Sequence, residues 1–292
     1  MTETILPASI IVVSYNKRQY TQLCVESLLQ GNPRPAQIVV IDNGSHDGTV
    51  EMLASEFAAR ARDAGVEFTL IRNDANLGAC TARNQGLEVA TGRYIGFMDN
   101  DIAVRSRGWL GVLAGVLEEH AACGIVGPKL VFPFEPWTIQ HAGAAISRTG
   151  RVQYLGRGEP IDAPEHNTRR AVQCLISACW LMRAQVPAQI GGLDEVFNPA
   201  QFEDFDFCYR AREAGWTVLY DPVAEMYHYE SVTTDNSPDV NYRYVTIRNG
   251  MEFKRRWRHV FETEDGPPDE QCRWQTLETR PIEQTGIPPI ID

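Results

Sequence analysis

Residues 37–65 decide the fold and read QIVVIDNGSHDGTVEMLASEFAARARDAG. The apolar run Gln37–Asp42 predicts a buried strand, and Thr49–Arg62 predicts a helix that ends just before Gly65. The same alternation occurs on both sides, with strands expected at 9–14, 67–72 and 93–98 and helices at 17–30 and 79–90. Continuous apolar strands separated by helices of this length indicate βαβ units. The sequence therefore predicts an α/β fold with a mostly parallel sheet flanked by helices.

Beyond about residue 125 the alternation loosens. Short strands are expected near 125–127, 144–147 and 175–182, and helices near 201–214 and 239–261. Residues 156–168, rich in Gly, Pro and Asp, predict a mobile loop. The last 30 residues contain five of the 17 prolines and predict an extended tail, either disordered or laid over the body.

Composition excludes several classes of protein. The chain has 292 residues with 27 basic and 38 acidic side chains, a net charge of −11 that disfavours nucleic acid as a partner. The sequence contains no apolar run of about 20 residues, so we expect no transmembrane segment and a cytoplasmic protein. Seven cysteines without a C-x-x-C pair predict reduced thiols that fill the core. The oligomeric state cannot be predicted from these features.

Polar residues follow each of the four predicted N-terminal strands. They are Ser14-Tyr15-Asn16, Asp42-Asn43-Gly44-Ser45, the segment 72–78, and Asp99-Asn100-Asp101. Ligands of parallel α/β sheets bind at the carboxyl ends of the strands, so we expect an active site at this edge.

Two groups of carboxylates stand out. Asp99 and Asp101, one residue apart at a strand end, could bind Mn²⁺ or Mg²⁺ through oxygen, although such residues are also common in solvated turns. His228, at the end of another predicted strand, could complete that metal shell or be an ordinary core or surface histidine. The acidic run 203–206 (EDFD) opens a predicted helix, where it either stabilises the N-terminus or supplies a general base.

Taken in chain order, these motifs resemble the GT-A glycosyltransferases, and within them the inverting family 2, over residues 8–230. The matching segments are 13–16 (VSYN), 40–49 (VIDNGSHDGT), 76–78 (NLG), 82–86 (ARNQG), 99–101 (DND), 191–195 (GGLDE), 203–204 (ED), Arg210 and 215–216 (GW).

The resemblance implies a role for each matching residue. Ser14, Tyr15 and Asp42 would hold the base of a nucleotide sugar, Arg83 and Asn100 would lie near the nucleotide, Asp99 would contact the ribose, Asp101 and His228 would bind the metal, and Asp204 would be the catalytic base with Asp206 its nearest rival. Without the resemblance, Arg83 is interpreted as a surface helix charge. Trp180 and Glu203 become candidate contacts to the sugar or acceptor, although core packing is an equal alternative for Trp180.

The implied function is metal-dependent, inverting transfer of one sugar from a pyrimidine diphosphate sugar, a UDP-hexose or UDP-N-acetylhexosamine, to an acceptor hydroxyl. Residues 1–125 would bind the nucleotide sugar, 126–262 the acceptor, and 263–292 would be a proline-rich tail. Alternatives are a dTDP-rhamnose-type transferase, because residues 39–45 (VVIDNGS) also resemble rhamnosyltransferases, and a non-catalytic sugar-nucleotide-binding subunit. The acceptor stays open between a soluble glycan, a peptide or protein, and a small metabolite.

Departures from the family pattern narrow this hypothesis. Processive members carry Q-x-x-R-W and transmembrane helices, whereas residues 254–257 read KRRW, so we expect a single-transfer enzyme. This basic cluster either binds phosphate or forms a solvated helix face. The loop 156–168 either closes over the acceptor or is an ordinary solvent loop. The G-x-G-x-x-G of a dehydrogenase is absent, as is the glycine-rich loop of a nucleotidyltransferase after the first strand.

Overall fold

The parallel part of the sheet comes from the N-terminal half of the chain. In the computed structural model, which describes residues 4–230, 232 and 240–292, β1 (Ile5–Ser14) pairs in parallel with both β2 (Arg34–Asp42) and β4 (Tyr94–Asp99), and β2 pairs with β3 (Glu67–Arg72). The four strands predicted from the sequence are therefore confirmed. Their register aligns Ser14 with Asp42 and Val13 with Asp99, so the polar strand ends meet at one edge.

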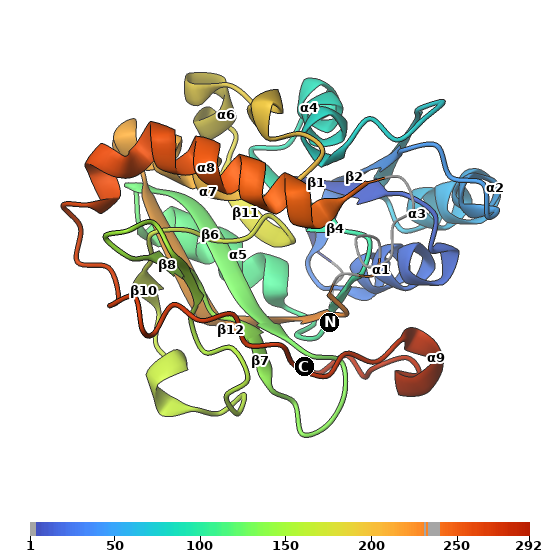
Figure 1. Cartoon of the computed structure of the whole chain (residues 1–292). Helices are drawn as coiled ribbons and strands as arrows, with labels where there is room; N and C mark the ends of the chain where they lie inside the picture. The colour runs from blue at the N-terminus through green and yellow to red at the C-terminus, as the bar shows by residue number, and fades with distance from the viewer. Residues whose placement is uncertain (1–3, 231, 233–239) are drawn as a thin grey trace.

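The C-terminal half continues the same sheet, in the order β10-β12-β6-β11-β4-β1-β2-β3 (Figure 1). β11 (Cys179–Arg183) is antiparallel to both β4 and β6 (Cys123–Val131), and β12 (Thr217–His228) is parallel to β6. Five short strands are added: β5 (Ile102–Val104) and β10 (Arg170–Ala171) pair with β12, β7 (Ile139–His141) pairs with β6, and β8 (Ala144–Ile146) forms a separate hairpin with β9 (Val152–Tyr154). The sheet crosses residue 125 without a break, and its second half is mixed, as predicted.

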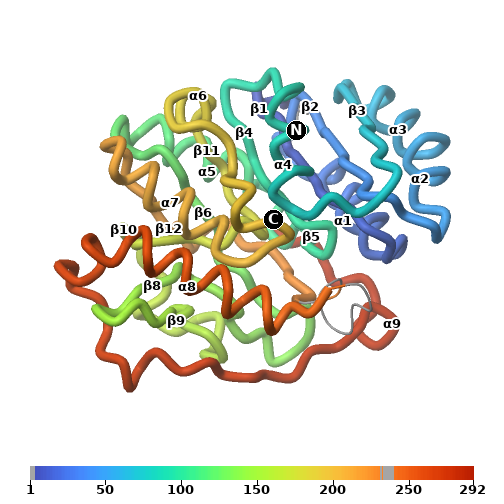
Figure 2. The backbone as a smooth tube through the Cα atoms, turned by 45° about the horizontal axis from the view of Figure 1, so that its top comes forward, coloured from blue at the N-terminus to red at the C-terminus, as the bar shows by residue number. Residues whose placement is uncertain are grey.

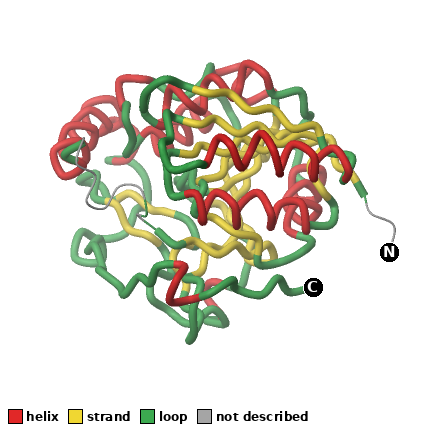
Figure 3. Tube along the Cα trace, turned by 90° about the vertical axis from the view of Figure 1, so that its right-hand side faces the viewer, coloured by secondary structure: helices red, strands yellow, loops and turns green. Residues whose placement is uncertain are grey.

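Helices pack against this sheet, as Figure 3 shows. Those with sheet contacts include α1 (Arg18–Gln30), α4 (Ala79–Val89), α5 (Trp109–Glu119), α6 (Gln185–Ile190) and α7 (Glu203–Glu213). The described residues also form α8 (Tyr242–Phe261), α9 (Ile282–Thr285) and the single 3-10 turns η2 (Pro164–His166) and η3 (Glu195–Phe197). The single helix expected over 49–62 is instead α2 (Thr49–Met52), a π turn η1 (Leu53–Phe57) and α3 (Ala58–Asp63). The sequence analysis did not identify α5, whose residues are apolar on most sides because the helix is largely buried.

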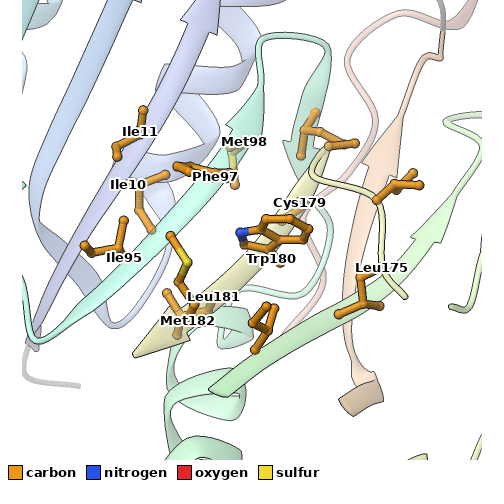
Figure 4. Close-up of a cluster of buried hydrophobic side chains, with 14 of the residues drawn as sticks. Ile10, Ile11, Ile95, Phe97, Met98, Leu175, Cys179, Trp180, Leu181 and Met182 are labelled. Carbon is orange, nitrogen blue, oxygen red and sulfur yellow. The ribbon is translucent and has the colours of Figure 1, made fainter. Parts of the chain in front are cut away.

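The core between β1, β4 and β11 holds the two halves together. Ile10 and Leu181 flank Gly96 on one face of the sheet, Phe97 and Trp180 contact each other on the other face, and all four are fully buried (Figure 4). All seven cysteines are free and buried, in agreement with the prediction of reduced thiols. Among the residues that the structure describes, no helix combines the length and the apolar character needed to cross a membrane.

The segment 156–168 is fastened to the body rather than standing free as a mobile loop. Arg157 is buried and forms a two-pronged ion pair with Glu230, with N–O distances of 2.7 and 2.9 Å. Lys129 donates to the Ile161 carbonyl at 2.9 Å and to Asn167 Oδ1 at 2.5 Å. Sequence composition could not reveal these contacts because both partners that hold the loop, Lys129 of β6 and Glu230 just after β12, are distant along the chain.

The C-terminal tail is laid over the body, the second of the two alternatives. In Figure 2 it runs from the end of α8 past β8 and β9 toward α9. The Ile282 amide donates to Tyr20 Oη at 3.1 Å, and Ile291 exchanges backbone hydrogen bonds with Arg105 and Arg107 at 2.7 and 2.8 Å. The tail therefore adds side chains to surfaces formed by much earlier parts of the chain.

The basic cluster 254–257 divides between a solvated part, with the Arg255 side chain 70% exposed, and a part that packs against the body. Arg256 Nη1 lies 2.9 Å from both Asp194 Oδ2 and Asp206 Oδ1, and Trp257 Nε1 donates to the same Asp206 oxygen at 2.9 Å. Arg255 is paired with Glu252. The cluster thus ties α8 to α7, a use that depends on tertiary neighbours and not on the local pattern.

Candidate active site

A cavity of about 500 Å³ opens at the carboxyl ends of the parallel strands. Most of its lining residues fall into two groups. The strand-end group follows β1–β4 and comprises Val13, Tyr15, Asn43, Asn76 and Asp99–Asp101. The hairpin group comprises Gln140, Val152, Tyr154, Ile176 and Trp274. The start of α7 and the end of β12 complete the lining with Glu203, Asp204 and His228.

Asp99, Asp101 and His228 come together because β5 folds back along the end of β12. Ile102 of β5 is the register partner of His228, so Asp101 stands beside the histidine, with 3.5 Å between Asp101 Oδ1 and His228 Nε2. The three side chains each offer a ligand atom within 4.8 Å of the others. Two carboxylates and an imidazole form a donor set that suits Mn²⁺ and leaves positions for phosphate oxygens.

The imidazole of His228 is oriented by a second layer of contacts. Gln140 Nε2 donates to Glu230 at 2.8 Å, so the Gln140 amide oxygen faces His228 Nδ1, 3.1 Å away. That oxygen can only accept, so Nδ1 of His228 carries a proton, and Nε2 is the ring nitrogen that faces Asp101 and would bind a metal once deprotonated. Burial lowers the pKa of His228, but the Asp101 carboxylate more than offsets this, and the net direction is upward.

Arg83 connects the strand-end group with α7. It is 3% exposed, and its guanidinium donates to Asp99 Oδ1 at 2.5 Å and to Glu203 Oε1 at 3.2 Å. Burial opposes its charge, but Asp99 and Glu203 raise the pKa of Arg83 overall. The interpretation of Arg83 as a surface helix charge is therefore wrong. It is a buried cation that fixes two carboxylates at the cavity.

Asp204 and Asp206, which are two positions apart on α7, have different environments. Asp204 lines the cavity, and its oxygens accept from the backbone amides of Phe205 at 2.8 Å and Ser177 at 3.3 Å. Asp206 is fully buried and bound to Arg210, Arg256 and Trp257. Burial, and then the neighbouring Glu203, raise the pKa of Asp204 well above its usual range. Of the two, only Asp204 lines the cavity, which is the position that a general base needs.

The start of α7 is held in an unusual backbone conformation. Gln201 and Phe202 have φ angles of 80° and 71°, in the left-handed region that non-glycine residues rarely adopt. Asn249 of α8 holds this turn, because its amide donates to the carbonyls of Phe197, Ala200 and Gln201 at 2.6–3.0 Å. The turn directs Glu203 and Asp204 to the cavity.

The residues after β1 and β2 divide between the cavity and the framework. Tyr15 lines the cavity. Asp42 Oδ2 accepts from the amides of Gly44 and Ser45 at 3.2 and 2.9 Å, while its buried Oδ1 has no hydrogen-bond partner among the described residues. Gly44 is required here, since a side chain would lie 2.9 Å from the Ala75 backbone at a φ of 83°.

Ser14 and Asn100 are tied to the framework through Thr21 of α1. The buried Ser14 hydroxyl shares a 2.8 Å hydrogen bond with Thr21, and Asn100 Nδ2 donates to the same hydroxyl at 2.9 Å. Asn100 still lines the cavity, but the Ser14 side chain does not. The expected contact between the Ser14 hydroxyl and a nucleotide base is therefore not supported.

Trp180 belongs to the core. It is 0% exposed, stacks on Phe207 with ring centroids 5.8 Å apart, and lies against Phe97 at 5.6 Å (Figure 4). Its neighbour across the sheet, Phe97, faces the same side because the two are register partners on β4 and β11. Core packing, the alternative named for Trp180, is what the structure shows. A sugar contact by this indole is excluded by its burial.

Several lining residues escaped the sequence analysis, namely Gln140, Tyr154, Tyr242, Glu230 and Trp274. Glu230 directly follows the His228 segment, so its position was within reach of the motif. The others lie in short strands, in α8 or in the tail, where no spacing or motif distinguishes a lining residue from a surface one. A second group of possible ligands, Glu159, Glu165 and His166, is largely exposed and lies outside the cavity lining.

Comparison with known proteins agrees with this geometry. The model of the glycosyl transferase family 2 matches residues 9–187. The chain is 26% identical over 262 residues to an uncharacterized protein of Sinorhizobium fredii, covering 86% of this chain and 27% of that protein. It is 27% identical over 252 residues to the N-acetylglucosaminyl-diphospho-decaprenol L-rhamnosyltransferase of Mycobacterium tuberculosis, covering 78% of each chain. The chain thus spans about a quarter of the Sinorhizobium protein.

Solved structures share the fold. GalNAc-T7, crystallised with UDP, GalNAc and Mn²⁺, superposes with a TM-score of 0.63 at 17% identity, over 78% of this chain and 44% of that one. The mannosyltransferase PcManGT from Pyrobaculum calidifontis, in complex with GDP-Man and Mn²⁺, gives a TM-score of 0.58 at 15% identity, over 92% and 69% of the two chains. These similarities support the GT-A architecture of the sheet and its helices.

Proposed function

The chain belongs to glycosyl transferase family 2, and from that premise we propose that it is a metal-dependent inverting glycosyltransferase. In this proposal it moves one sugar from a pyrimidine diphosphate sugar, a UDP-hexose or UDP-N-acetylhexosamine, to an acceptor hydroxyl. One observation carries the proposal. The cluster of Asp99, Asp101 and His228 shares a cavity with Asp204, whose pKa is raised.

Asp101 and His228 are the proposed metal ligands, with Asp99 contacting the ribose or the same ion. The donor set fits Mn²⁺ or Mg²⁺, because His228 Nε2 faces Asp101 Oδ1 at 3.5 Å and can bind a metal in its deprotonated form, while Nδ1 stays bonded to Gln140. When bound, the metal would offset the negative charge that develops on the leaving nucleoside diphosphate. Arg83 holds Asp99 in place through its 2.5 Å hydrogen bond.

Asp204 would act as the general base. Its carboxylate would take the proton from the acceptor hydroxyl while the hydroxyl oxygen attacks the anomeric carbon and the bond to the diphosphate breaks. A single displacement of this kind inverts the anomeric configuration, and a second carboxylate as nucleophile is not needed. The amides of Ser177 and Phe205 orient Asp204, and Glu203 Oε1 accepts a hydrogen bond from Arg83.

The donor base is assigned to Asp42 and Tyr15, at the ends of β2 and β1. Tyr15 lines the cavity, whereas Asp42 is 1% exposed and lies behind the lining. The buried Oδ1 of Asp42, which has no hydrogen-bond partner among the described residues, is the proposed acceptor for an N–H group, such as N3–H of uracil or thymine. A dTDP-rhamnose-type donor remains the alternative, because N3–H is common to both bases. The similarity to a mycobacterial rhamnosyltransferase favours keeping it.

The test is a thermal-shift screen of the purified protein with UDP, dTDP, GDP, CMP and ATP, each with Mn²⁺ and with EDTA. A ligand at a hundredfold excess over Kd stabilises the folded state by about 2.7 kcal/mol. We expect a metal-dependent rise in melting temperature with UDP or dTDP alone, and release of that nucleotide from the matching sugar donor. A shift with GDP or ATP, or turnover in EDTA, would contradict the proposal.

A further inference from the structure

The tail brings one exposed aromatic side chain to the cavity. All six tryptophans lie in the described residues, and of these only Trp274 is exposed, with 63% of its surface accessible. Trp274 lines the cavity together with Val152 and Tyr154 of β9. It lies outside residues 9–187, the part of the chain that matches the family model. Exposure of a large aromatic ring at a cavity costs free energy in water, which makes a ligand-binding role worth testing.

Trp274 is held in place before any ligand arrives. The Tyr154 ring meets it edge-on, with centroids 5.4 Å apart and an interplanar angle of 77°. The Arg157 guanidinium lies over the indole, 4.2 Å from its centroid, and also donates to the neighbouring Gln275 carbonyl at 2.9 Å. Arg157 is itself fixed by Glu230. Arg157 covers part of the indole, and 63% of the Trp274 surface stays accessible.

From this arrangement we propose that Trp274 and Tyr154 form the acceptor subsite and that the acceptor is a saccharide, an inference that rests on the proposed function. A sugar ring has an apolar face of C–H groups that packs on an indole, and hydroxyls that need hydrogen-bond partners around it. Glu230 and Gln140, which also line the cavity, supply carboxylate and amide groups of that kind. A rigid aromatic platform loses little conformational entropy on binding, so it suits such a weakly polar face.

The position of the platform fits the acceptor and not the donor base. Tyr154 lies close enough to Asp204 for that carboxylate to contribute, after burial, to a raised pKa of the tyrosine. Asp204 is the proposed base, which must reach the acceptor hydroxyl. The donor base is assigned to Asp42 and Tyr15, which follow β2 and β1 in the strand-end part of the fold. A saccharide bound on Trp274 would therefore reach Asp204 from the side of the cavity that the hairpin group lines.

The test compares Trp274→Ala with the wild type in an assay of UDP release from UDP-glucose and UDP-N-acetylglucosamine with Mn²⁺. The acceptor panel consists of p-nitrophenyl glycosides, Ser- and Tyr-containing peptides, and glycerol. We expect the glycosides to accelerate release, and Trp274→Ala to raise the KM for the glycoside at least tenfold with kcat within twofold. The KM for the donor and the slow hydrolysis without acceptor should stay unchanged. Trp274→Phe should retain the glycoside KM within about threefold.

Ile287→Ala is the matched control, because Ile287 is in the same tail and 76% exposed but does not line the cavity. It should behave as wild type. The proposal is overturned if peptides or glycerol accelerate release and glycosides do not, if no glycoside does, or if Trp274→Ala leaves the glycoside KM unchanged. Weakened UDP binding in Trp274→Ala would overturn it too, by assigning the indole to the donor base.

A second measurement separates this inference from the proposed function. If the wild type neither shifts with UDP and Mn²⁺ nor turns over a donor, the proposed function fails. Saturation-transfer NMR with methyl glycosides and cellobiose still decides the platform in that case. A signal in the wild type that is lost in Trp274→Ala and kept in Ile287→Ala supports it, and the absence of a signal overturns it.

Discussion

The strand-end group and the hairpin group line one cavity but are built in different ways. The strand-end side chains follow four consecutive strands within residues 13–101, and each occupies the position that a parallel sheet gives to its ligand-binding residues. The hairpin side chains come from β7, β9, the segment before β11 and the tail, so that Gln140 and Trp274 share a wall although 134 residues separate them. The first group depends on sheet topology, and the second on individual tertiary contacts.

This difference separates chemistry from selectivity. The proposed metal site of Asp99, Asp101 and His228 is fixed by strand register, and Arg83 is fixed by its ion pairs with Asp99 and Glu203. These contacts leave little room for change without loss of the site. The hairpin group is held by Arg157, Glu230 and the tail, which can vary while the sheet stays the same. We therefore expect substitutions in the strand-end group to abolish reaction with every acceptor, and those in the hairpin group to change acceptor preference.

The largest effect is expected for Asp101→Ala. Removing one of the proposed ligands would lower the affinity for the metal, so metal-stimulated release of nucleotide should fall about a thousandfold. The measurement is nucleotide release against Mn²⁺ concentration. Glu165→Ala serves as control, because Glu165 belongs to the exposed acidic cluster outside the cavity lining. Equal loss in both variants would refute the assignment.

Asp204→Asn and Asp206→Asn should differ in kind. Without its base, Asp204→Asn should lower kcat by about 10²–10⁴ while keeping UDP and Mn²⁺ binding and without lowering the free energy of unfolding. Asp206→Asn weakens the buried contacts to Arg210 and Arg256, so it should cost about 3 kcal/mol of that free energy. Kinetics and urea unfolding of both variants check this. Loss of binding by Asp204→Asn, or unchanged stability of Asp206→Asn, would contradict the division of roles.

The pH dependence should report the same carboxylate. Burial and Glu203 raise the pKa of Asp204, so kcat/KM should fall about tenfold per pH unit below that raised pKa, well above the usual range of an aspartate. The folded protein then binds this proton more tightly than the unfolded chain, and the free energy of unfolding should decrease as pH rises from about 4 to the raised pKa. Urea unfolding between pH 4.5 and 7.5 tests the sign. The slope should be smaller in Asp204→Asn.

How far the sequence predicts the site follows the same division. Asp99, Asp101 and His228 could be named because a strand end is visible as an apolar run followed by polar residues. The predicted contact of Ser14 with the nucleotide base is not supported, since a polar residue at a strand end can also point to a neighbouring helix, as Ser14 does toward Thr21. Trp180 and Trp274 show the limit most clearly. Aromatic residues carry no local mark of burial, and the tail that positions Trp274 has no periodic pattern.

The smallest effect is expected where the tail is anchored. Ile282 is 9% exposed and packs in a small cluster with Tyr20 and Tyr229. Ile282→Ala should therefore lower the free energy of unfolding by about 1–2 kcal/mol. This is less than for a truncation in the central core, because Ile282 lies near the surface. Ile287→Ala, at an exposed position of the same tail, should change the free energy of unfolding by less than about 0.5 kcal/mol. If the tail positions the hairpin group, Ile282→Ala should also raise the KM for the acceptor. Equal effects of the two variants on stability and KM would mean that the tail covers the body without contributing to the cavity.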